Sequence, residues 1–348
     1  MRVGIKQVAE RAGVSATTVS HVVNKTRYVS PEVEKRVNDA IKELNYTPNI
    51  MARGLRTNTV KTVAVIVQEA STPFFSRVVD EISDVLYKEG YSLLLCTTRS
   101  KVNDELNVVR SMLQQQVCGI ILAPQQMDFD YRTLCPSKDF PLVFIDCKTK
   151  FVPCNAVTCD NYQASYNAIK ALIQKGHTNI GYIYSSRNYE LSTGRDRFQG
   201  YLDALADSGL ARDEKIIVGR EQQTFENGYD AMKQLLQEKK ATACFVAENP
   251  MAQGVFKCLM DYKKRIPEEM AMICYDDFEW SQLTVPTISA IRQPMKEMGR
   301  KAAELLLKKI GDSDAQCENI ILKSEFILRE SCLSLIHISE PTRLGMIS

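Results

Sequence analysis

Three carboxylates and one guanidinium stand where this chain could bind a small polar molecule. Asp146, Glu248 and Asp276 each come directly after an apolar segment that is typical of a buried strand, and Arg197 lies where a turn leads into a helix. Because ligands of parallel α/β sheets bind beyond the carboxyl ends of the strands, we expect these side chains to meet in one cleft. Carboxylates accept hydrogen bonds and a guanidinium donates them, which suits the recognition of a polar ligand.

Other polar and aromatic side chains belong to the same candidate site. The full ligand-binding set is Thr72, Phe74, Phe75, Asp146, Arg197, Gln223, Glu248, Asp276 and Gln293. A single charged residue at a strand end is often only a solvated loop residue. The prediction therefore depends on the set as a whole.

The sequence carries no signature of catalysis. It contains no glycine pattern typical of phosphate or dinucleotide binding and no Gly-x-Ser-x-Gly motif, and its three histidines lie far apart. The Asp276-Asp277 doublet has no further ligands at a spacing that suits a metal. We therefore expect neither an enzyme nor a cofactor.

Positive charge is concentrated at the start of the chain. Residues 1–60 carry ten Lys and Arg against five Asp and Glu, whereas the whole chain has a net charge of +2. The rest of the chain is therefore slightly acidic. A small basic segment on an acidic body indicates contact with a polyanion.

The basic segment has the pattern of a helix-turn-helix. Apolar residues recur at helical spacing over residues 5–12, Gly13 can end that helix, and Ser15 can cap a second helix that begins at Ala16. A third helix is expected over residues 31–45, with proline at its first position. Two helices joined by a tight glycine turn are typical of DNA-binding proteins, and a packing module without DNA is the alternative.

The second helix offers small and polar side chains to a major groove. Its expected exposed face consists of Ala16, Thr17, Ser20 and His21. Ser15, Thr18 and the amides at the start of this helix suit contacts with phosphates.

The sequence closely resembles that of the LacI/GalR family of transcriptional regulators. The shared motifs are residues 5–20, Val23-Asn24, residues 46–49 and residues 52–56. The likeness continues along the body to about Cys332 and so covers almost the whole chain. It implies a DNA-binding regulator, most simply a repressor, whose partner is double-stranded operator DNA.

The resemblance also implies which side chains contact the operator. Ala16, Thr17 and His21 read bases, and residues 49–56 form a hinge helix that inserts Leu55 into the minor groove. The complete DNA-binding set is Ser15, Ala16, Thr17, Thr18, Ser20, His21, Asn24, Tyr46, Asn49, Ala52, Arg53, Leu55 and Arg56. Because the hinge has no apolar face of its own, we expect DNA and a partner subunit to order it.

His21 departs from the family, which usually has arginine at this position. Arginine holds guanine through two hydrogen bonds, whereas histidine offers one donor and a partial charge. We predict an operator that differs from the family norm at the base pair facing His21. A contact from His21 to phosphate alone is the alternative.

After residue 60, apolar strands alternate with amphipathic helices, as in a parallel sheet covered on both faces. The strand at residues 142–146 is expected to end the first half, and a second half of the same kind begins at residue 179. The expected fold is an all-α helix-turn-helix head and an α/β body of two doubly wound parallel-sheet subdomains of the periplasmic-binding-protein-like type.

The expected divisions are a DNA-binding domain at 1–45, a hinge at 46–60, an effector-binding and dimerisation domain at 61–332, and a non-native tail at 333–348. Within the body, we assign 61–159 with 291–325 to the first subdomain and 160–290 with 326–332 to the second.

Family resemblance assigns Arg197 and Asp276 as effector contacts, and two other positions depart from its sugar-binding pattern. Glu248 stands where asparagine is usual, and Gln223 stands where an aromatic residue often stacks on a sugar. An ionised glutamate only accepts hydrogen bonds, which suits a nucleobase or an amine, unless Glu248 simply pairs with Arg197. We expect a sugar or sugar derivative as the effector. Control by a phosphorylated carrier protein is a further alternative.

We expect a cytoplasmic homodimer that binds a near-palindromic operator, with effector binding in the cleft either ordering or melting the hinge helices. A solute-binding receptor would share the body but would need a signal peptide, and no apolar run approaches the ~18 residues that span a bilayer. The 11 cysteines, without a Cys-x-x-Cys motif, suit a reducing compartment.

Residues 333–348 resemble a translated sequencing adapter, and a native disordered tail is the alternative.

Overall fold

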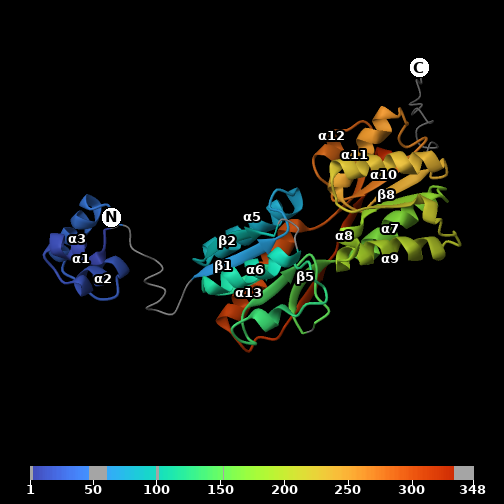
Figure 1. Ribbon diagram of the computed structural model, residues 1–348. Coiled ribbons are helices and arrows are strands. Elements are labelled where there is room, and N and C mark those ends of the chain that lie inside the picture. Colours follow the sequence, from blue (N-terminus) through green and yellow to red (C-terminus); the bar gives the residue numbers. More distant parts are fainter. Residues whose placement is uncertain (1–2, 47–60, 99–101, 152, 333–348) are drawn as a thin grey trace, which may run out of the picture. The chain divides into compact units, whose positions relative to one another are not determined.

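The computed structural model describes residues 3–46, 61–98, 102–151 and 153–332. The chain divides into two compact units, residues 1–60 and residues 61–348, and each has its own hydrophobic core (Figure 1). Some predicted features lie outside the described residues, namely Asn49, Ala52, Arg53, Leu55, Arg56 and the tail at 333–348.

The first unit is a module of three helices. They are α1 (Ile5–Ala12), α2 (Ala16–Asn24) and α3 (Pro31–Glu43). Gly13 ends α1 in the left-handed conformation, with φ of 65°, and the Ser15 side chain caps α2 by accepting a hydrogen bond from an amide of its first turn. Val8, Val19 and Val37, one from each helix, are fully buried between them. The predicted helix-turn-helix is confirmed.

The first lobe of the second unit contains a parallel sheet with the strand order β11-β5-β4-β3-β1-β2. The strands are β1 (Thr62–Val67), β2 (Ser92–Thr97), β3 (Gly119–Leu122), β4 (Leu142–Ile145), β5 (Asn155–Cys159) and β11 (Asn319–Leu322). All but the first residue of β1 are buried, because helices cover both faces of the sheet at that strand.

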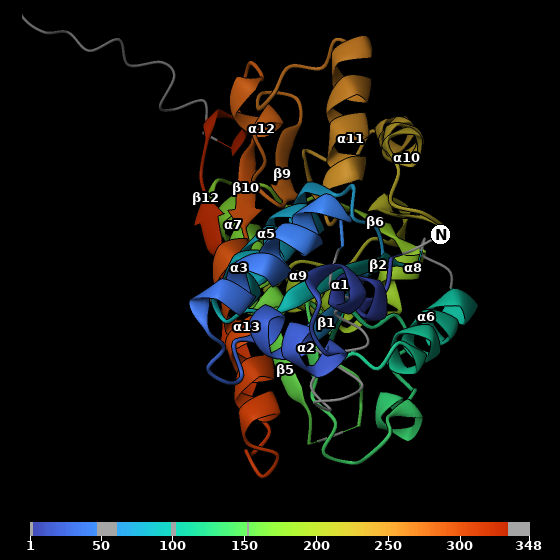
Figure 2. The ribbon, with the colours of Figure 1, turned by 90° about the vertical axis from the view of Figure 1, so that its left-hand side faces the viewer.

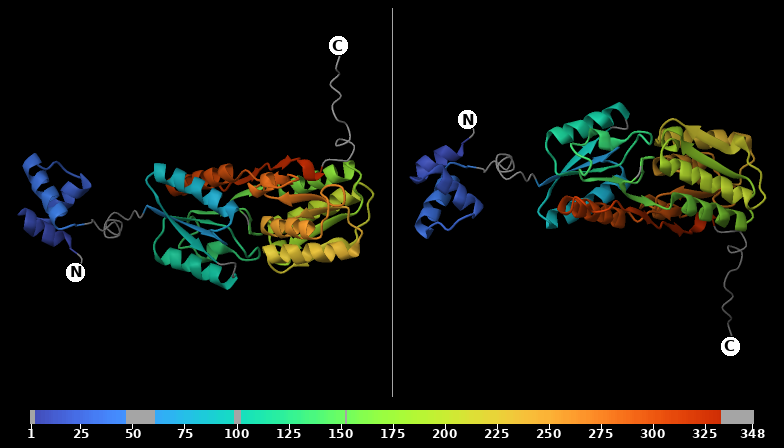
Figure 3. Two further views of the ribbon diagram at one scale, coloured as in Figure 1. Left: turned by 90° about the horizontal axis from the view of Figure 1, so that it is seen from above. Right: turned by 90° about the horizontal axis from the view of Figure 1, so that it is seen from below.

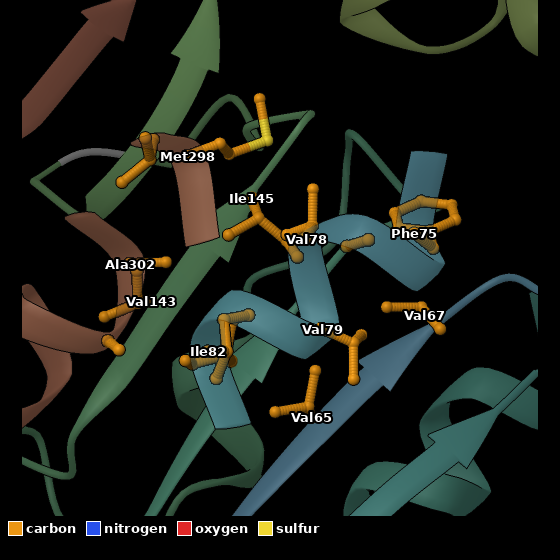
Figure 4. Packing of buried hydrophobic residues seen from close by; sticks show 14 of the residues in the cluster. Val65, Val67, Phe75, Val78, Val79, Ile82, Val143, Ile145, Met298 and Ala302 are labelled. Carbon is orange, nitrogen blue, oxygen red and sulfur yellow. The ribbon is translucent and has the colours of Figure 1, made fainter. Parts of the chain in front are cut away.

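Three long helices cover this sheet. Helices α5 (Pro73–Lys88) and α13 (Met295–Gly311) lie on one face, and α6 (Val102–Gln114) lies on the other (Figure 3). In Figure 4, Val79 of α5 lies near Val65 and Val67 of β1, Val78 of α5 lies beside Ile145 of β4, and Ala302 of α13 lies beside Val143 of β4. The labelled residues of this core are Val65, Val67, Phe75, Val78, Val79, Ile82, Val143, Ile145, Met298 and Ala302. Burial of such side chains, at roughly 25 cal/mol per Å², stabilises the lobe.

The second lobe repeats the plan, with the strand order β12-β10-β9-β8-β6-β7. Its strands are β6 (Ile180–Ser185), β7 (Ile217–Arg220), β8 (Ala243–Val246), β9 (Ala271–Tyr275), β10 (Ser289–Arg292) and β12 (Glu325–Ile327). The long helices are α7 (Asn161–Gln174), α9 (Ser192–Ala206), α10 (Phe225–Glu238) and α11 (Asn249–Asp261), and the short ones are α8 (Ser186–Tyr189) and α12 (Trp280–Leu283). Helices α10 and α11 pack side by side (Figure 2), and β12 is antiparallel to β10.

The chain passes between the lobes three times: after β5, after β10 and after β11. The first and third passages are joined at Asp160, whose amide donates to the carbonyl of Leu322 at 3.0 Å. The Asp160 carboxylate accepts a second hydrogen bond from the amide of Ser324 at 2.7 Å. The two lobes are therefore connected by adjacent segments that lie far apart in the sequence.

The expectation that the strand at residues 142–146 ends the first half is wrong. Strand β5 follows it in the same sheet and pairs with β4 on one side and β11 on the other. All five residues of β5 are buried, but Asn155 and Thr158 interrupt the apolar run that would have marked a central strand.

None of the described helices has the length and apolar composition that a bilayer-spanning helix needs.

Candidate functional site

The start of α2 holds the polar groups predicted to contact DNA phosphates. The Ser15 hydroxyl lies 2.8 Å from that of Thr18 and accepts a hydrogen bond from the Thr18 amide at 3.0 Å. Thr17 is exposed, and Ala16 is half-buried against the core of the unit. This leaves the N-terminus of α2 with exposed side chains and the positive end of the helix dipole, which suits a phosphate.

His21 is held by a neighbouring hydroxyl. Its Nδ1 lies 2.8 Å from Oγ1 of Thr26, in the loop after α2. The ring therefore has only Nε2 left for a base edge, so it cannot form the paired contact that arginine makes with guanine. Asn24 ends α2, and Tyr46, half-buried, packs against the core of the unit beyond α3.

Ser20 is not on the exposed face of α2, and that expectation is wrong. It is 9% exposed and lies one helical turn after Ala16 and one before Val23, both of which pack against the core. The helical period of 3.6 residues places these three positions on one stripe, and the apolar stripe of α2 is therefore wider than its valines indicated. Thr17 and His21 lie on the other side of the helix.

A cleft lies between the carboxyl ends of the two sheets of the second unit. An inner cavity of about 100 Å³ adjoins an outer one of about 490 Å³, and residues from both lobes line each of them. All nine residues of the predicted ligand-binding set line the inner cavity: Thr72, Phe74, Phe75, Asp146, Arg197, Gln223, Glu248, Asp276 and Gln293. Their role in binding a ligand stays a prediction.

Arg197 is the buried cation of this cleft. It projects from α9, is 5% exposed, and donates from Nε to Oδ1 of Asn161 at 2.9 Å and from Nη1 to the carbonyl of Ala247 at 2.7 Å. Its guanidinium lies 3.5 Å from the centre of the Tyr275 ring. Burial opposes its charge, but the ring and nearby carboxylates outweigh burial and raise its pKa, so Arg197 stays protonated.

Glu248 enters the cleft from the end of β8 and is 3% exposed. Its carboxylate accepts hydrogen bonds from the amide of Ser185 and from Nδ2 of Asn188, both at 3.1 Å. Burial raises the pKa of Glu248 to about 7, although Asn188 and Arg197 oppose that rise. Among the described residues, Glu248 is thus held by these two groups, and its pairing with Arg197 is limited to electrostatic attraction.

Two aspartates face the cleft from opposite lobes. Burial raises the pKa of Asp146 to about 6, and burial also raises the pKa of Asp276. Asp276 accepts a hydrogen bond from Nε2 of Gln293 at 2.7 Å. The other amide atom, Oε1 of Gln293, is buried and has no hydrogen-bond partner among the described residues. Among the described residues that line the inner cavity, Arg197 is thus the one cation, and it lies among several acceptors.

An aromatic pair completes the wall that belongs to the first lobe. Thr72 caps the N-terminus of α5. Phe74 and Phe75 therefore lie in the first turn of that helix. The two rings pack edge to face, with centroids 5.1 Å apart, and both residues are at least nine-tenths buried. They give the cleft an apolar surface on which a planar ligand could pack.

The predicted ligand-binding set leaves out several residues that line the inner cavity. They are Gln68, Pro73, Asn188, Thr193, Asn249, Pro250, Gln253 and Phe278. Pro73 and Asn249 belong to the strand-end segments that supply Thr72 and Glu248, whereas most of the others lie further along a loop or in the first turn of a helix. In the part of the chain that the structure describes, no group of three or more His, Cys, Asp or Glu is placed to hold a metal ion.

A helix-turn-helix unit joined in one chain to a two-lobed body with a ligand-sized cleft defines a class of transcriptional regulators. The family model described as bacterial regulatory proteins, lacI family, matches residues 4–49, and the model of a periplasmic binding protein-like domain matches residues 169–332. The chain belongs to the LacI family. It is a DNA-binding transcriptional repressor, as the predicted fold and motifs indicated.

Relatives named HTH-type transcriptional repressor PurR align with almost the whole chain. That of Mannheimia succiniciproducens is 33% identical over 330 residues, which cover 94% of this chain and 98% of the relative. That of Haemophilus influenzae strain PittEE is 34% identical over 337 residues, which cover 95% and 99%.

Solved structures share the fold. The complex of the transcriptional regulator CelR with cellobiose is 29% identical, with a TM-score of 0.71 over 95% of this chain and 100% of that one. The Lac repressor dimer bound to operator and to the anti-inducer ONPF has a TM-score of 0.83 at 24% identity, over 96% and 100% of the two chains.

Proposed function

We propose that this repressor adjusts its operator affinity to a small molecule that donates several N–H hydrogen bonds, such as a nucleobase or an amine. The observation that carries the proposal is the excess of acceptors in the inner cavity, where Asp146, Glu248 and Asp276 accompany Arg197, the one cation among its described lining residues. Burying carboxylates costs free energy unless they receive hydrogen bonds or a positive charge. A ligand rich in N–H donors would supply the hydrogen bonds, and an amine would also supply positive charge.

The unpaired oxygen of Gln293 supports the same ligand class. Because its Nε2 donates to Asp276, its buried Oε1 can only accept, and it lacks a protein donor among the described residues. A buried polar atom without a partner costs about 1–3 kcal/mol, which a ligand N–H would recover. Gln293 and Asp276 together form a pair that a ligand with two adjacent donors could satisfy.

Within this class, the aromatic pair favours a planar nucleobase over a saturated amine. Phe74 and Phe75 line the same inner cavity as the three carboxylates, so one ligand could stack on a ring and donate at its edge. The relatives named PurR also favour this ligand class over the carbohydrate expected from the sequence.

A carbohydrate is the second candidate. The similar regulator CelR was solved as a complex with cellobiose. In this chain, Gln223, Asn188 and Thr193 line the cavity, and side chains of these types can both donate to and accept from sugar hydroxyls. A sugar would leave more of the carboxylate charge uncompensated than an N–H-rich ligand would.

We further propose that the repressor acts in the cytoplasm as a homodimer. Two copies of the first unit would place Thr17 and His21 in successive major grooves of a near-palindromic operator. The ligand would change the distance between the first lobes of the two subunits and so order or melt the paired hinges.

A ligand screen tests the proposed class directly. Thermal unfolding of the purified protein is measured with guanine, hypoxanthine, adenine, putrescine and spermidine, and with ribose and cellobiose. A ligand that binds the folded state raises the melting temperature, by an amount that grows with its concentration relative to Kd. Stabilisation by a nucleobase or an amine but not by the sugars supports the proposal, and stabilisation by a sugar alone overturns it.

A further inference from the structure

Two cysteines lie at the amino ends of neighbouring strands in the first lobe. Strands β5 and β11 are parallel, with Ala156 opposite Asn319. Cys154 and Cys317 each precede this pair by two residues, just before the first residues of β5 and β11, and a continuation of the register would place them opposite one another on one face. Neighbouring strands lie about 4.8 Å apart, which is within the Cα separation that a disulfide spans.

Hydrogen bonds hold the two strands together beside these cysteines. The amide of Ala156 donates to the carbonyl of Glu318 at 3.0 Å. The amide of Glu318 donates in turn to Oδ1 of Asn155 at 2.9 Å. Asn155 and Glu318 immediately follow Cys154 and Cys317, so the two thiols are kept near one another without a bond between them.

The two thiols differ in access to solvent. Cys154 is 7% exposed, whereas Cys317 is the one exposed cysteine among the eleven, all of which lie in the described part of the chain and are free. Burial raises the pKa of Cys154, and the charge of Cys317 raises it further, which is consistent with their closeness. An exposed thiol beside a buried one is the usual arrangement of an attacking and a resolving cysteine.

A guanidinium lies beside both thiols. Arg132 donates from Nη1 to the carbonyl of Pro153 at 3.2 Å, directly before Cys154, and pairs with the carboxylate of Asp130 at 2.9 and 3.0 Å. The hydrogen bond to Asp130 is the main reason that the pKa of Arg132 is raised, and the negative charges of the two thiolates add to that rise. The charge of Arg132 opposes the rise that burial causes in the pKa of Cys154, and the thiolate is the form that reacts.

We propose that Cys154 and Cys317 form a reversible disulfide between β5 and β11 when they meet a low-molecular-weight disulfide such as glutathione disulfide. The Cys317 thiolate attacks one sulfur of the oxidant, whose S–S bond breaks, and one glutathione thiolate leaves with the bonding electrons. Cys154 then loses its proton, its thiolate attacks the sulfur of Cys317, and the second glutathione thiolate leaves. The two cysteines lose two protons and two electrons, and the oxidant becomes two thiols.

The cross-link would tie the edge strand β11 to its neighbour β5. Strand β11 is the edge strand, and it leads through Ser324 into the third passage between the lobes. A bond from Cys154 to Cys317 closes a chain segment that contains almost the whole second lobe. A loop of that length strongly restricts the unfolded chain, so oxidation should stabilise the folded protein.

The full-length protein is incubated with glutathione disulfide, and its free thiols are counted after denaturation. We expect two of the 11 thiols to be lost, a peptide pair joined through Cys154 and Cys317 in mass spectra without reductant, and recovery of all thiols with dithiothreitol. The melting temperature should rise by roughly 5 °C or more on oxidation. Cys154→Ser should instead keep one glutathione on Cys317, and Cys317→Ser should lose no thiol.

Cys135→Ser is the matched control, because Cys135 is a half-buried thiol of the same core cluster as the buried Cys154. It should form the cross-link as the parent does. A bond between Cys135 and Cys154 in the parent protein, a glutathione adduct that persists on Cys317 of the parent, or retention of all thiols would each overturn the proposal. Arg132→Gln should slow cross-linking several-fold without abolishing it. An unchanged rate would show that the guanidinium does not assist the reaction of the two thiols.

Discussion

Asp146 and Asp276 occupy equivalent positions in the two lobes and share an unusual backbone conformation. Asp146 follows β4 and Asp276 follows β9, which hold the same place in the strand order of their sheets. Their φ angles are 64° and 67°, in the left-handed region that few residues other than glycine adopt. This conformation costs free energy and tends to persist at binding sites, so each lobe directs one carboxylate into the cleft at a cost to stability.

The first prediction concerns these two carboxylates. Asp146→Asn and Asp276→Asn should each weaken binding of the ligand found in the screen by tenfold or more. Each change removes a charged acceptor and introduces an N–H group that faces the ligand donors, and a charge-assisted hydrogen bond contributes about 1.5–3 kcal/mol. Titration calorimetry measures the effect. Asp230→Asn, at an exposed carboxylate on α10, is the control and should bind as the parent does.

The second prediction concerns the dependence of stability on pH. The pKa of Glu248 rises from an ordinary value of 4.5 to about 7 in the folded protein. Between these values the folded protein binds more protons than the unfolded chain, so the free energy of unfolding falls as pH rises. Glu248→Gln removes this contribution, which amounts to about 3 kcal/mol at most.

Unfolding at about pH 5 and about pH 8 tests this prediction without ligand. The parent should lose more stability across this range than Glu248→Gln does, with the remaining loss due in part to Asp146. Parallel profiles for the two proteins would mean that Glu248 is ionised throughout the range.

The third prediction concerns the operator. His21 is tied to Thr26 through Nδ1 and so presents one ring nitrogen to DNA. His21→Arg should gain a preference for guanine at the facing base pair, since a paired contact to guanine contributes about 1–3 kcal/mol of discrimination. Selection of binding sites from a random duplex library, carried out for both proteins, measures the preference. The same consensus from both would assign His21 to phosphate contact alone.

The fourth prediction concerns the hinge implied by the family resemblance. Leu55→Ala should weaken operator binding roughly tenfold or more, because the apolar wedge that keeps the minor groove open is lost. Ligand binding in the cleft should not change. Fluorescence anisotropy with labelled operator and calorimetry with ligand separate the two effects, and equal operator affinity for both proteins would exclude the hinge assignment.

The fifth prediction concerns the dimer. Leu283, the last residue of α12, is 81% exposed, and Val285, two residues further along the chain, is 88% exposed. Exposed apolar patches often mark surfaces that associate. Leu283→Glu should shift the protein toward the monomer in sedimentation experiments. Leu328→Glu, at another exposed leucine, should leave the dimer intact, and a dimer that survives Leu283→Glu would locate the interface elsewhere.

How far the sequence predicts this fold differs from strand to strand. Strand β1 is a continuous apolar run because both of its faces are covered, and that pattern can be recognised directly. Strand β5 is as fully buried but contains Asn155, whose side chain joins β5 to Glu318 near β11. Strand β11 has three aliphatic residues but is only four residues long, and it is largely exposed at the edge, so its burial follows no clear pattern.

The site shows the same contrast. The strand-end rule brought Asp146, Glu248 and Asp276 together in advance, because parallel strands all end at one edge of a sheet. It could not identify Asn161, which holds Arg197 in place, or Asn188, which holds Glu248. Those contacts depend on how α7 and α8 pack against the sheet, and no periodic pattern in the sequence encodes that packing.

The most direct test of this account measures operator affinity with and without ligand. The duplex selected from the library is titrated by fluorescence anisotropy in the presence of guanine, hypoxanthine, spermidine, ribose or cellobiose, with the parent protein and Asp276→Asn. The account predicts that a nucleobase or an amine changes the operator Kd at least tenfold for the parent and much less for Asp276→Asn. A sugar that changes the Kd while nucleobases and amines do not, or an equal response from both proteins, would contradict it.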